Sequence, residues 1–404
     1  MDGRRYRADF PLLENNRFIY LDSAATAQRP ASVIQAEKDF YETMNANPLR
    51  GLYELSMRAT EGYEEARKTA GELIGAKPSE TIFVRNTSEA LNLVAYSYGL
   101  ACLKEGDEIL TSVTEHHSNM LPWRMVAERT GAVLKYLEPE PDGTLTEEEL
   151  TLKITEKTRL VAIGQVSNVL GCENPVKRIC ELAHQAGAVV VVDAAQSVPH
   201  MKVDVKELSA DFLAYSGHKL MGPFGIGVLY GKEELLDKMP PFLRGGEMIE
   251  TVTLEGQTWA ELPHKFEAGT VNASGAWGLK AAIGYLLSVG YDNIRAIEDE
   301  LTLLLMEGMK ELPYVKIQGS EDPLKHHGIV SFTIDGVHPH DISSILDGYG
   351  INIRAGHHCA EPLMRYLALG STARASLYLY NTKEDIRALL EKIPEIRRIL
   401  GFER

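Results

Sequence analysis

The 404-residue sequence has few cysteines and no long hydrophobic run. Its cysteines lie far apart and form no Cys-x-x-Cys pair, which argues against a disulfide framework or a structural zinc site. The longest strongly apolar stretch, Ala186–Val192, is far shorter than the roughly 20 residues that cross a bilayer. No apolar run follows the arginines of the first ten residues, so we predict neither a secretory signal nor a membrane anchor and expect a cytoplasmic protein. The four cysteines are Cys102, Cys172, Cys180 and Cys359.

The sequence also lacks an excess of basic residues. It has 42 lysines and arginines against 57 aspartates and glutamates, so its formal net charge is −15. A negative surface repels phosphate backbones and anionic lipids, which makes nucleic acids and membranes poor partners. The length and the 44% hydrophobic content are those of a globular protein with two or three domains. Small metabolites or other proteins are the expected partners.

Short β-branched runs alternate with amphipathic helical patterns between about residues 77 and 231. This alternation predicts an α/β fold in which helices cover both faces of a largely parallel sheet. In such sheets ligands collect beyond the carboxyl ends of the strands. The predicted strands are Thr81–Val84, Glu108–Val113, Ala132–Tyr136, Leu160–Gln165, Ala188–Asp193, Asp211–Ser216 and Ile226–Tyr230, and the helices between them include Ser88–Leu103, Leu121–Thr130 and Pro175–Ala186.

The pattern changes after about residue 288. A long helix is followed by a mixture of strands and helices, which predicts a smaller α+β domain packed against the first and a cleft between the two. The predicted elements are helix Asn293–Leu312, strand Gly328–Ile334, helix His340–Tyr349, strands Ile351–Arg354 and Ala373–Leu379, and helix Lys383–Leu400.

Two charged residues follow apolar strands of the first region. Lys219 comes directly after strand Asp211–Ser216, where desolvation lowers the pKa of an amine and frees it for Schiff-base formation. Asp193 ends the most apolar strand, and its carboxylate suits a protonated pyridine nitrogen. A surface lysine and a helix-capping aspartate are the simpler alternatives for each residue taken alone.

Polar residues follow two further strands. Thr87 and Ser88 open a helix, whose N–H groups and positive dipole end suit a phosphate, although an ordinary helix cap explains them equally well. His116, in Glu115-His-His-Ser-Asn119, places a flat imidazole where it can lie over an aromatic ring. No carboxylate or cysteine cluster completes a metal-ligand set near this histidine pair, so we predict no metal.

The second region contains one cysteine in an unusual setting. Cys359 stands in the segment Arg354-Ala-Gly-His-His-Cys359, and positive charge near a thiol favours the nucleophilic thiolate. The alternative, a small buried hydrophobic residue, holds for Cys102 and Cys180. Arg374 begins a predicted strand, and its guanidinium suits a substrate carboxylate, with a surface ion pair as the alternative.

These segments, in this order, resemble the fold-type I pyridoxal-phosphate (PLP) enzymes of the class V aminotransferase group. More narrowly, they resemble the SUF-type (group II) cysteine desulfurases and selenocysteine lyases. The similarity runs nearly end to end, through Tyr20-Leu-Asp-Ser-Ala-Ala-Thr26, Thr114-Glu-His-His-Ser-Asn119, Gln165-Val-Ser-Asn-Val-Leu-Gly171, Val192-Asp-Ala-Ala-Gln196, Ser216-Gly-His-Lys219, Phe266-Glu-Ala-Gly-Thr270, Arg354-Ala-Gly-His-His-Cys359 and Arg374-Ala-Ser376.

The resemblance implies a fold and a division into domains. A large PLP-binding domain, residues 16–290, would contain a mostly parallel seven-stranded sheet. A smaller α+β domain, residues 291–404 with residues 1–15, would carry the cysteine loop. The resemblance further implies a homodimer that supplies sulfur for iron–sulfur cluster assembly.

The resemblance also implies roles for individual residues. Lys219 would bind PLP and move the substrate's Cα proton, and Asp193 would pair with the pyridine nitrogen. Cys359 would attack the sulfur of L-cysteine, which leaves a persulfide on the enzyme and releases L-alanine. The other cofactor contacts would come from Gln196, His116, Thr87, Ser88, Ser216, His218 and, toward the phosphate of a partner subunit, Thr270, and the substrate contacts from Asn168, Arg354 and Arg374.

Several questions stay open at this point. The substrate is L-cysteine, L-selenocysteine or, for a related aminotransferase, another amino acid, and a scaffold without turnover is a further alternative. The sulfur acceptor is an E-type or a zinc-containing U-type protein, with His340 a candidate zinc-exchange ligand. The sequence departs from the expected family pattern at Leu49, Tyr53, Arg244, Val271 and Glu361.

Overall fold

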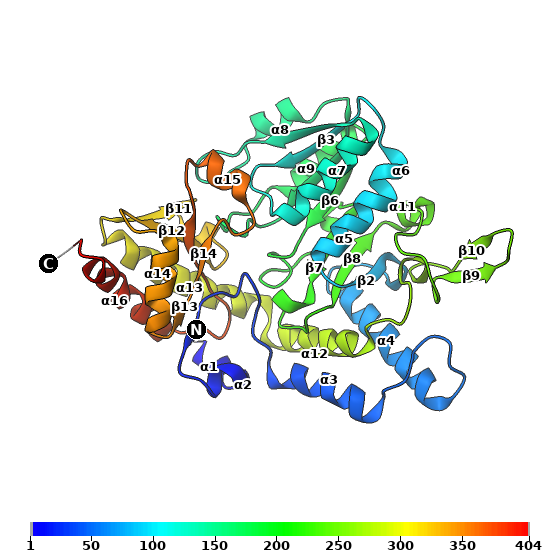
Figure 1. The fold of residues 1–404 in the computed structure, drawn as a ribbon, viewed down its shortest axis with the longest axis horizontal. Coiled ribbons are helices and arrows are strands. Elements are labelled where there is room, and N and C mark those ends of the chain that lie inside the picture. Colours follow the sequence, from blue (N-terminus) through cyan, green and yellow to red (C-terminus); the bar gives the residue numbers. More distant parts are fainter. Residues whose placement is uncertain (1–2, 403–404) are drawn as a thin grey trace.

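The larger sheet of the computed structural model, which describes residues 3–402, contains seven strands in the order β2-β8-β7-β6-β5-β3-β4 (Figure 1). Only β8 runs against its neighbours, β2 and β7, and the other adjacent pairs are parallel. The predicted seven-stranded, mostly parallel sheet is therefore confirmed, with small shifts at the strand ends. The strands are β2 Thr81–Val84, β3 Glu108–Ser112, β4 Val133–Leu137, β5 Thr158–Gly164, β6 Val189–Asp193, β7 Phe212–Ser216 and β8 Gly227–Gly231.

Both faces of this sheet are covered, as the unbroken apolar run of β6 predicts. Val191 packs on one face with residues of α5 (Thr87–Val94) and α7 (Leu121–Thr130). Val190 and Val192 pack on the other face with residues of α9 (Val176–Gln185) and α12 (Ala273–Val289). The central strands are thus held rigidly, which fixes the positions of the side chains at their ends.

The predicted helix Ser88–Leu103 is wrong in detail. The structure has α5, then a π-helical turn over Ala95–Gly99, and then the short α6 (Leu100–Cys102). Gly99 lies so close to α7 that a Cβ atom there would be 2.9 Å from a methyl carbon of Val126. The turn thus packs closely against a distant helix, a contact that local periodicity does not report.

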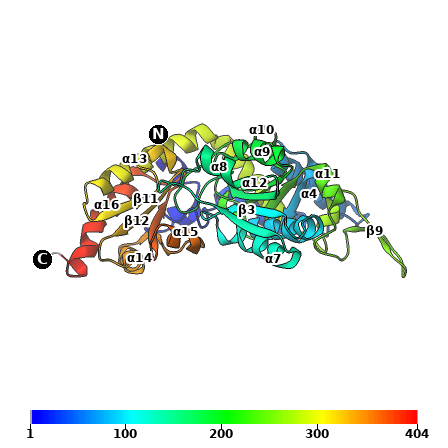
Figure 2. The same cartoon turned by 90° about the horizontal axis from the view of Figure 1, so that it is seen from above.

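A second sheet of four antiparallel strands lies beside the first, in the order β11-β12-β15-β14 (Figure 2). The prediction missed β11 (Val315–Gln318). It also expected one strand over residues 351–354, where the structure has β13 (Ile351–Asn352), paired with β1 (Ile19–Tyr20), and the separate β14 (Arg354–Gly356). The remaining elements here are β12 Ile329–Ile334, β15 Thr372–Ser376, α13 Tyr291–Lys310, α14 Pro339–Gly348, α15 Glu361–Tyr366 and α16 Lys383–Ile399.

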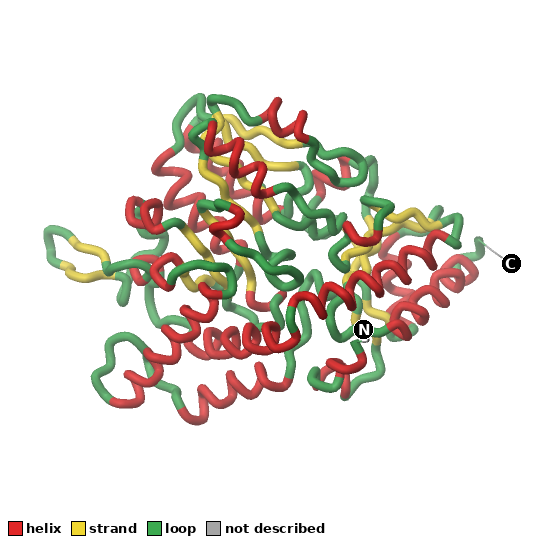
Figure 3. The backbone as a smooth tube through the Cα atoms, turned by 180° about the vertical axis from the view of Figure 1, so that it is seen from behind, coloured by secondary structure: helices red, strands yellow, loops and turns green. Residues whose placement is uncertain are grey.

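The two sheets form separate groups when the molecule is seen from behind (Figure 3). The predicted domain boundary falls at Gly290, between α12 and α13, and the division itself stays a prediction. Residues 1, 2, 403 and 404 of the predicted domains lie outside the described residues. No helix in the described part of the chain is long and apolar enough to span a membrane.

The other elements surround these two groups. A hairpin of β9 (Ile249–Val252) and β10 (Gln257–Trp259) projects from one end of the molecule (Figures 1 and 2). The remaining helices are α1 Arg4–Arg7, α2 Pro11–Glu14, α3 Ala31–Thr43, α4 Glu54–Glu72, α8 Glu147–Lys153, α10 Val205–Leu208 and α11 Glu233–Lys238.

Candidate active site

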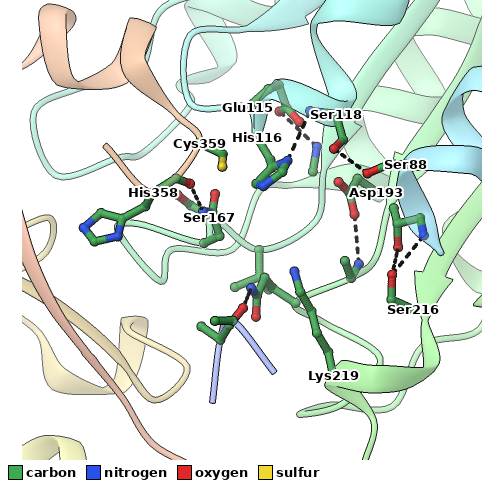
Figure 4. Close-up of a pocket in the computed structure, with 18 of the residues that line it drawn as sticks. Ser88, Glu115, His116, Ser118, Ser167, Asp193, Ser216, Lys219, His358 and Cys359 are labelled. Carbon is green, nitrogen blue, oxygen red and sulfur yellow. Dashed lines mark hydrogen bonds between the residues drawn. The ribbon is translucent and has the colours of Figure 1, made fainter. Parts of the chain in front are cut away.

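The carboxyl ends of β2, β3, β5, β6 and β7 lie at one edge of the larger sheet, and the loops that follow them line a cavity of about 210 Å³. The loop after β14 closes the cavity from the side of the smaller sheet (Figure 4). Every predicted site residue except Thr270 lines this cavity. They are Thr87, Ser88, His116, Asn168, Asp193, Gln196, Ser216, His218, Lys219, Arg354, Cys359 and Arg374.

Thr270 lies elsewhere, as an exposed residue of a second depression that Gly225 and Val271 also line. The resemblance assigns Thr270 to the phosphate of a partner subunit, so its place outside this chain's own cavity does not contradict that expectation. The role itself stays a prediction.

Lys219 and Asp193 extend into the cavity from adjacent strands (Figure 4). Burial lowers the pKa of Lys219 to about 8, although the nearby Asp193 carboxylate opposes this shift. Burial also raises the pKa of Asp193 against the opposing effects of Lys219 and of the Ala195 N–H, which donates to Oδ1 at 2.9 Å. A ligand with a protonated ring nitrogen would offset this burial of Asp193.

A cluster of hydroxyl groups lies at the N-terminus of α5. Ser216 Oγ accepts from the Thr87 N–H at 2.9 Å and lies 2.7 Å from Thr87 Oγ1. Ser88 Oγ lies 2.6 Å from the hydroxyl of Ser118, a residue that sequence reasoning did not single out. Asn86 caps the helix by accepting from the Glu89 N–H at 3.0 Å. The hydroxyls and the dipole of this eight-residue helix make a site for an anion such as phosphate.

His116 is held at the cavity wall by its own loop. Its Nδ1 accepts from the Ser118 N–H at 3.1 Å, and burial, together with the nearby Lys219, lowers its pKa to about 3. The imidazole is therefore neutral near pH 7, which suits a flat contact with an aromatic ring. Among the described residues no cluster of three His, Cys, Asp or Glu side chains has the arrangement of a metal site.

Glu115, behind His116, is a cavity residue to which the sequence analysis gave no role. Its Oε1 accepts from the Gly164 N–H at 3.0 Å and its Oε2 from Asn119 Nδ2 at 2.6 Å. Gly164 pairs with Asp193 across β5 and β6. The motif itself contains one partner, Asn119, but the other, Gly164, comes from β5, which the sequence order alone does not place beside Glu115.

Four buried polar atoms of the cavity have no hydrogen-bond partner among the described residues. They are Gln196 Oε1, His218 Nδ1, His358 Nδ1 and Arg374 Nε. Buried polar atoms are rarely left unpaired in proteins, so these atoms indicate a polar ligand. Gln196 Nε2 donates to the Ala24 carbonyl at 2.8 Å, and burial lowers the pKa of His218 to about 4. The cavity thus offers a carboxylate, an amine, an anion site and unpaired polar atoms around one space.

Cys359 is exposed and faces the cavity from the loop after β14 (Figure 4). Both it and His358 have left-handed backbones, with φ of 55° and 52°. The expected positive surroundings are only partly present, because His358 turns toward Thr372, with Nε2 2.9 Å from Oγ1, and burial lowers its pKa to about 3. His358 is therefore neutral and gives the thiol no positive charge.

Arg374 and Asn168 are in contact at the back of the cavity. Arg374 Nη1 donates to the Asn168 carbonyl at 2.8 Å, and Asn168 Nδ2 donates to the His358 carbonyl at 2.8 Å. Asn168 thus joins the cysteine loop to Arg374. Asp22, which sequence reasoning did not assign, accepts from Arg374 Nη2 at 3.2 Å and from Arg354 Nε at 3.1 Å.

The residues that depart from the family pattern lie outside the cavity lining. Tyr53 is exposed, and Arg244 stacks on Trp259 of the β9–β10 hairpin with a 5.5 Å separation. Glu361 pairs with Arg365 at 2.7 Å, and this hydrogen bond lowers the pKa of Glu361. Leu49 has a φ of 81°, and its N–H donates to Thr60 Oγ1 at 2.7 Å.

A family model described as aminotransferase class-V matches residues 19–389. The chain belongs to the class-V aminotransferase family. PLP is the cofactor of this family, and the residues present fit it: the buried carboxylate of Asp193, the amine of Lys219 and the anion site at Thr87 surround a space with unpaired polar atoms.

Relatives of this family member include cysteine desulfurases. The chain is 50% identical to a probable cysteine desulfurase of Halalkalibacterium halodurans, over 99% of both chains, and 47% identical to one of Synechocystis, over 96% of this chain and 94% of the relative. It is also similar to the apo structure of a cysteine desulfurase from Thermococcus onnurineus NA1, with a TM-score of 0.95, 44% identity and 98% of each chain covered.

Proposed function

We propose that this member of the class-V aminotransferase family is a PLP-dependent cysteine desulfurase that converts L-cysteine to L-alanine and keeps the sulfur as a persulfide on Cys359. The observation that carries the proposal is that Lys219 and Cys359 line one cavity from opposite sides, the first from the larger sheet and the second from the loop after β14. A transaminase needs the amine but has no use for an exposed thiol at the cavity wall. The full-length relatives with this name support the same reading.

The cofactor would be held by the residues that line the inner wall. Asp193 would pair with its ring nitrogen, His116 would lie against its ring, and its phosphate would be held by Thr87, Ser88, Ser216 and His218. PLP supplies an electron sink for bonds at the substrate's Cα. Lys219, whose pKa is about 8, is basic enough to take the Cα proton and acidic enough to return it near neutral pH.

The substrate is bound and attacked from the outer wall. Arg374, with its buried and unpartnered Nε, receives the carboxylate, and Arg354 adds a second positive charge. The Cys359 thiolate then attacks the substrate sulfur, so that an S–S bond forms and the Cβ–S bond breaks. The electron pair of that bond stays on Cβ, which takes up a proton. L-cysteine and the enzyme thiol become L-alanine and an enzyme persulfide with no external oxidant.

We extend the proposal to the path of the sulfur. The exposed position of Cys359 allows an acceptor protein to reach the persulfide, and the SUF route of iron–sulfur cluster assembly is the proposed destination. For a U-type acceptor, His340 is a candidate zinc-exchange ligand: it is exposed, and its Nε2 lies 3.9 Å from the position of a Cβ atom on Gly356, three residues before Cys359. An E-type acceptor is the alternative.

The assembly and the compartment complete the proposal. The active enzyme is a homodimer in which exposed Thr270 reaches the cofactor phosphate of the partner subunit. The cysteines among the described residues are free thiols, two of them exposed, which suits the reducing conditions of the cytoplasm.

The decisive experiment measures L-alanine and protein-bound persulfide from L-cysteine in the native enzyme, in Lys219→Ala and in Cys359→Ser. We expect Lys219→Ala to lose both products together with the absorbance of the bound cofactor. Cys359→Ser should keep that absorbance and lose both products. Full alanine release by either variant would refute the proposal. If Cys359→Ser retains activity on L-selenocysteine alone, the thiol is needed only for sulfur, because selenolate is the better leaving group.

A further inference from the structure

Two arginines of the cavity share one carboxylate, that of Asp22. Arg354 donates to Asp22 Oδ2 through Nε at 3.1 Å, and its Nη2 also lies 3.1 Å from that oxygen. Arg374 Nη2 donates to the other oxygen, Oδ1, at 3.2 Å. Arg354 and Arg374 line the cavity, whereas Asp22 lies behind them. No role in the reaction proposed above requires this carboxylate.

We propose that Asp22 is a specificity-determining positioning residue: it cancels one of the two guanidinium charges, so that the cavity accepts an amino acid with one carboxylate and disfavours an amino acid whose side chain is also anionic. The inference rests on the proposed function, because it names the charge class of the substrate of that same site.

The backbone around Asp22 leaves this carboxylate little freedom. Leu21, immediately before it, donates its N–H to the Asn352 carbonyl at 2.9 Å and accepts at its own carbonyl from the Ser376 N–H at 2.8 Å. Asp22 also forms an isolated parallel bridge with Ser376, two residues beyond Arg374. The carboxylate is therefore anchored to the strand that carries Arg374, and its side chain is only 16% exposed.

The Asp22 carboxylate sets the net charge of the cavity wall that contains the two arginines. The imidazoles of His116 and His358, which are also part of the cavity, are neutral near pH 7, because burial lowers the pKa of each to about 3. The positive charge on this wall therefore comes from Arg354 and Arg374. The Asp22 carboxylate pairs with both arginines, so one positive charge is left unmatched, which is the requirement of one substrate carboxylate. Without Asp22, a second guanidinium charge is free to pair with an anionic side chain.

Asp22 also leaves one hydrogen-bond donor of Arg374 available to a substrate. It occupies Nη2 of Arg374, and the Asn168 carbonyl occupies Nη1, whereas the buried Nε has no partner among the described residues. The arrangement orients Arg374 through two of its nitrogens and keeps the third for a ligand.

The test compares two ligands that have the same shape and differ by one charge, L-aspartate and L-asparagine. Their dissociation constants are measured by titration calorimetry on the native holoenzyme and on Asp22→Asn. We expect the ratio of the aspartate constant to the asparagine constant to fall by about tenfold or more in Asp22→Asn, which is the effect of about 1.4 kcal/mol of new charge pairing. A ratio within about twofold of the native value would overturn the proposal, whatever happens to each constant alone.

Further variants separate charge from structure. Asp22→Glu should restore the native ratio. Arg354→Ala, at a half-exposed side chain, should move the ratio in the opposite direction, and this keeps the test informative if Asp22→Asn does not fold. Asp335→Asn, which neutralises an exposed carboxylate paired with Lys316, should leave the ratio unchanged. An unchanged or falling ratio in Arg354→Ala would refute the inference.

These titrations need no turnover. Failure of the ratio to move would reject the role of Asp22 while the desulfurase activity stands. An absence of alanine and persulfide from L-cysteine in the native enzyme would instead reject the proposed function. The two failures are therefore distinguishable in one set of samples.

Discussion

The backbone N–H of His117 donates to the carbonyl oxygen of Cys359 at 2.7 Å. A second bond runs between the same loops, because His117 Nε2 accepts from the Glu361 N–H at 3.1 Å. The loop after β3 of the larger sheet thus holds the cysteine loop of the smaller sheet by two bonds, at the Cys359 carbonyl and two residues further on. Since Cys359 has a φ of 55°, a conformation that costs a non-glycine residue free energy, these bonds stabilise a strained position.

We predict that His117→Ala slows persulfide formation by about tenfold or more without changing cofactor binding. The substitution removes the Nε2 acceptor and loosens the thiol, and small misplacements of a reacting group cost this much or more in rate. Rapid mixing with L-cysteine gives the first-turnover rate, and the cofactor absorbance reports binding. Glu361→Ala is the matched control, because it removes the Glu361 side chain, which pairs with Arg365, but keeps the backbone N–H that donates to His117. Equal slowing in both variants would refute the role of the His117 ring.

Glu115 gives a prediction for stability against pH. Burial raises the pKa of this carboxyl to about 8, and the hydrogen bonds from Gly164 and Asn119 only oppose the shift. In the unfolded chain the group ionises near pH 4.3. The folded protein therefore binds more protons between these values, so this group's contribution to stability is present in acid and is lost as the pH rises to 8.

Glu115→Gln removes that titration. We expect the stability of the cofactor-free native protein, relative to that of the variant, to fall by up to about 1.4 kcal/mol per pH unit between pH 5 and 8. Urea unfolding at several pH values measures the difference. Glu105→Gln, at an exposed carboxylate, should show no such slope. Parallel stability curves for native protein and Glu115→Gln would contradict the raised pKa.

The larger sheet and the residues at its strand ends were predictable because short apolar runs and their polar successors are local patterns. Lys219, Asp193 and Thr87 each follow such a run, and parallel strands bring their ends together by geometry. The order of the strands, and the reversed direction of β8, depend on distant pairing that no local pattern encodes.

The contacts in the outer wall of the cavity were harder to predict from the sequence. Arg354, Arg374 and Cys359 were found from charge, chemistry and family resemblance, but their contacts join three distant segments of the chain. Asp22 lies 332 residues from Arg354 in sequence. The neutral state of His358 follows from its burial against Thr372, which composition alone gives no means to infer.

A buried ion pair explains the glutamate of the Phe266-Glu-Ala-Gly-Thr270 motif. Glu267 accepts from Arg67 Nη2 at 2.8 Å, from the Tyr63 hydroxyl at 2.9 Å and from the Phe83 N–H at 2.7 Å. Burial alone would raise the pKa of Glu267, but Arg67 holds it below the ordinary value. The pair ties α4 and β2 to the loop that carries Thr270.

We predict that Glu267→Gln lowers the free energy of unfolding by about 3–5 kcal/mol at pH 7, because it removes the buried carboxylate that pairs with the buried Arg67 charge. Glu64→Gln is the control: this carboxylate pairs with the same arginine at 2.8 Å but is 35% exposed, so its loss should cost less than about 1 kcal/mol. Denaturant unfolding measures both. Since the pKa of Glu267 is lowered, the difference between native protein and Glu267→Gln should shrink in acid. Equal costs for the two variants would contradict this account.

The lowered pKa of Lys219 predicts how the cofactor-free protein captures PLP. An ordinary lysine has a pKa near 10.4, whereas burial brings that of Lys219 to about 8. Only the neutral amine reacts with an aldehyde, so the rate of attachment, trapped by borohydride and measured by mass spectrometry, should rise about tenfold per pH unit up to pH 8 and then level off. A free lysine analogue, with the ordinary pKa near 10.4, should show its plateau about two pH units higher under the same conditions. A common plateau near pH 10 for both amines would mean that the strand end does not desolvate the Lys219 amine, and the chemistry assigned to it would need another source of reactivity.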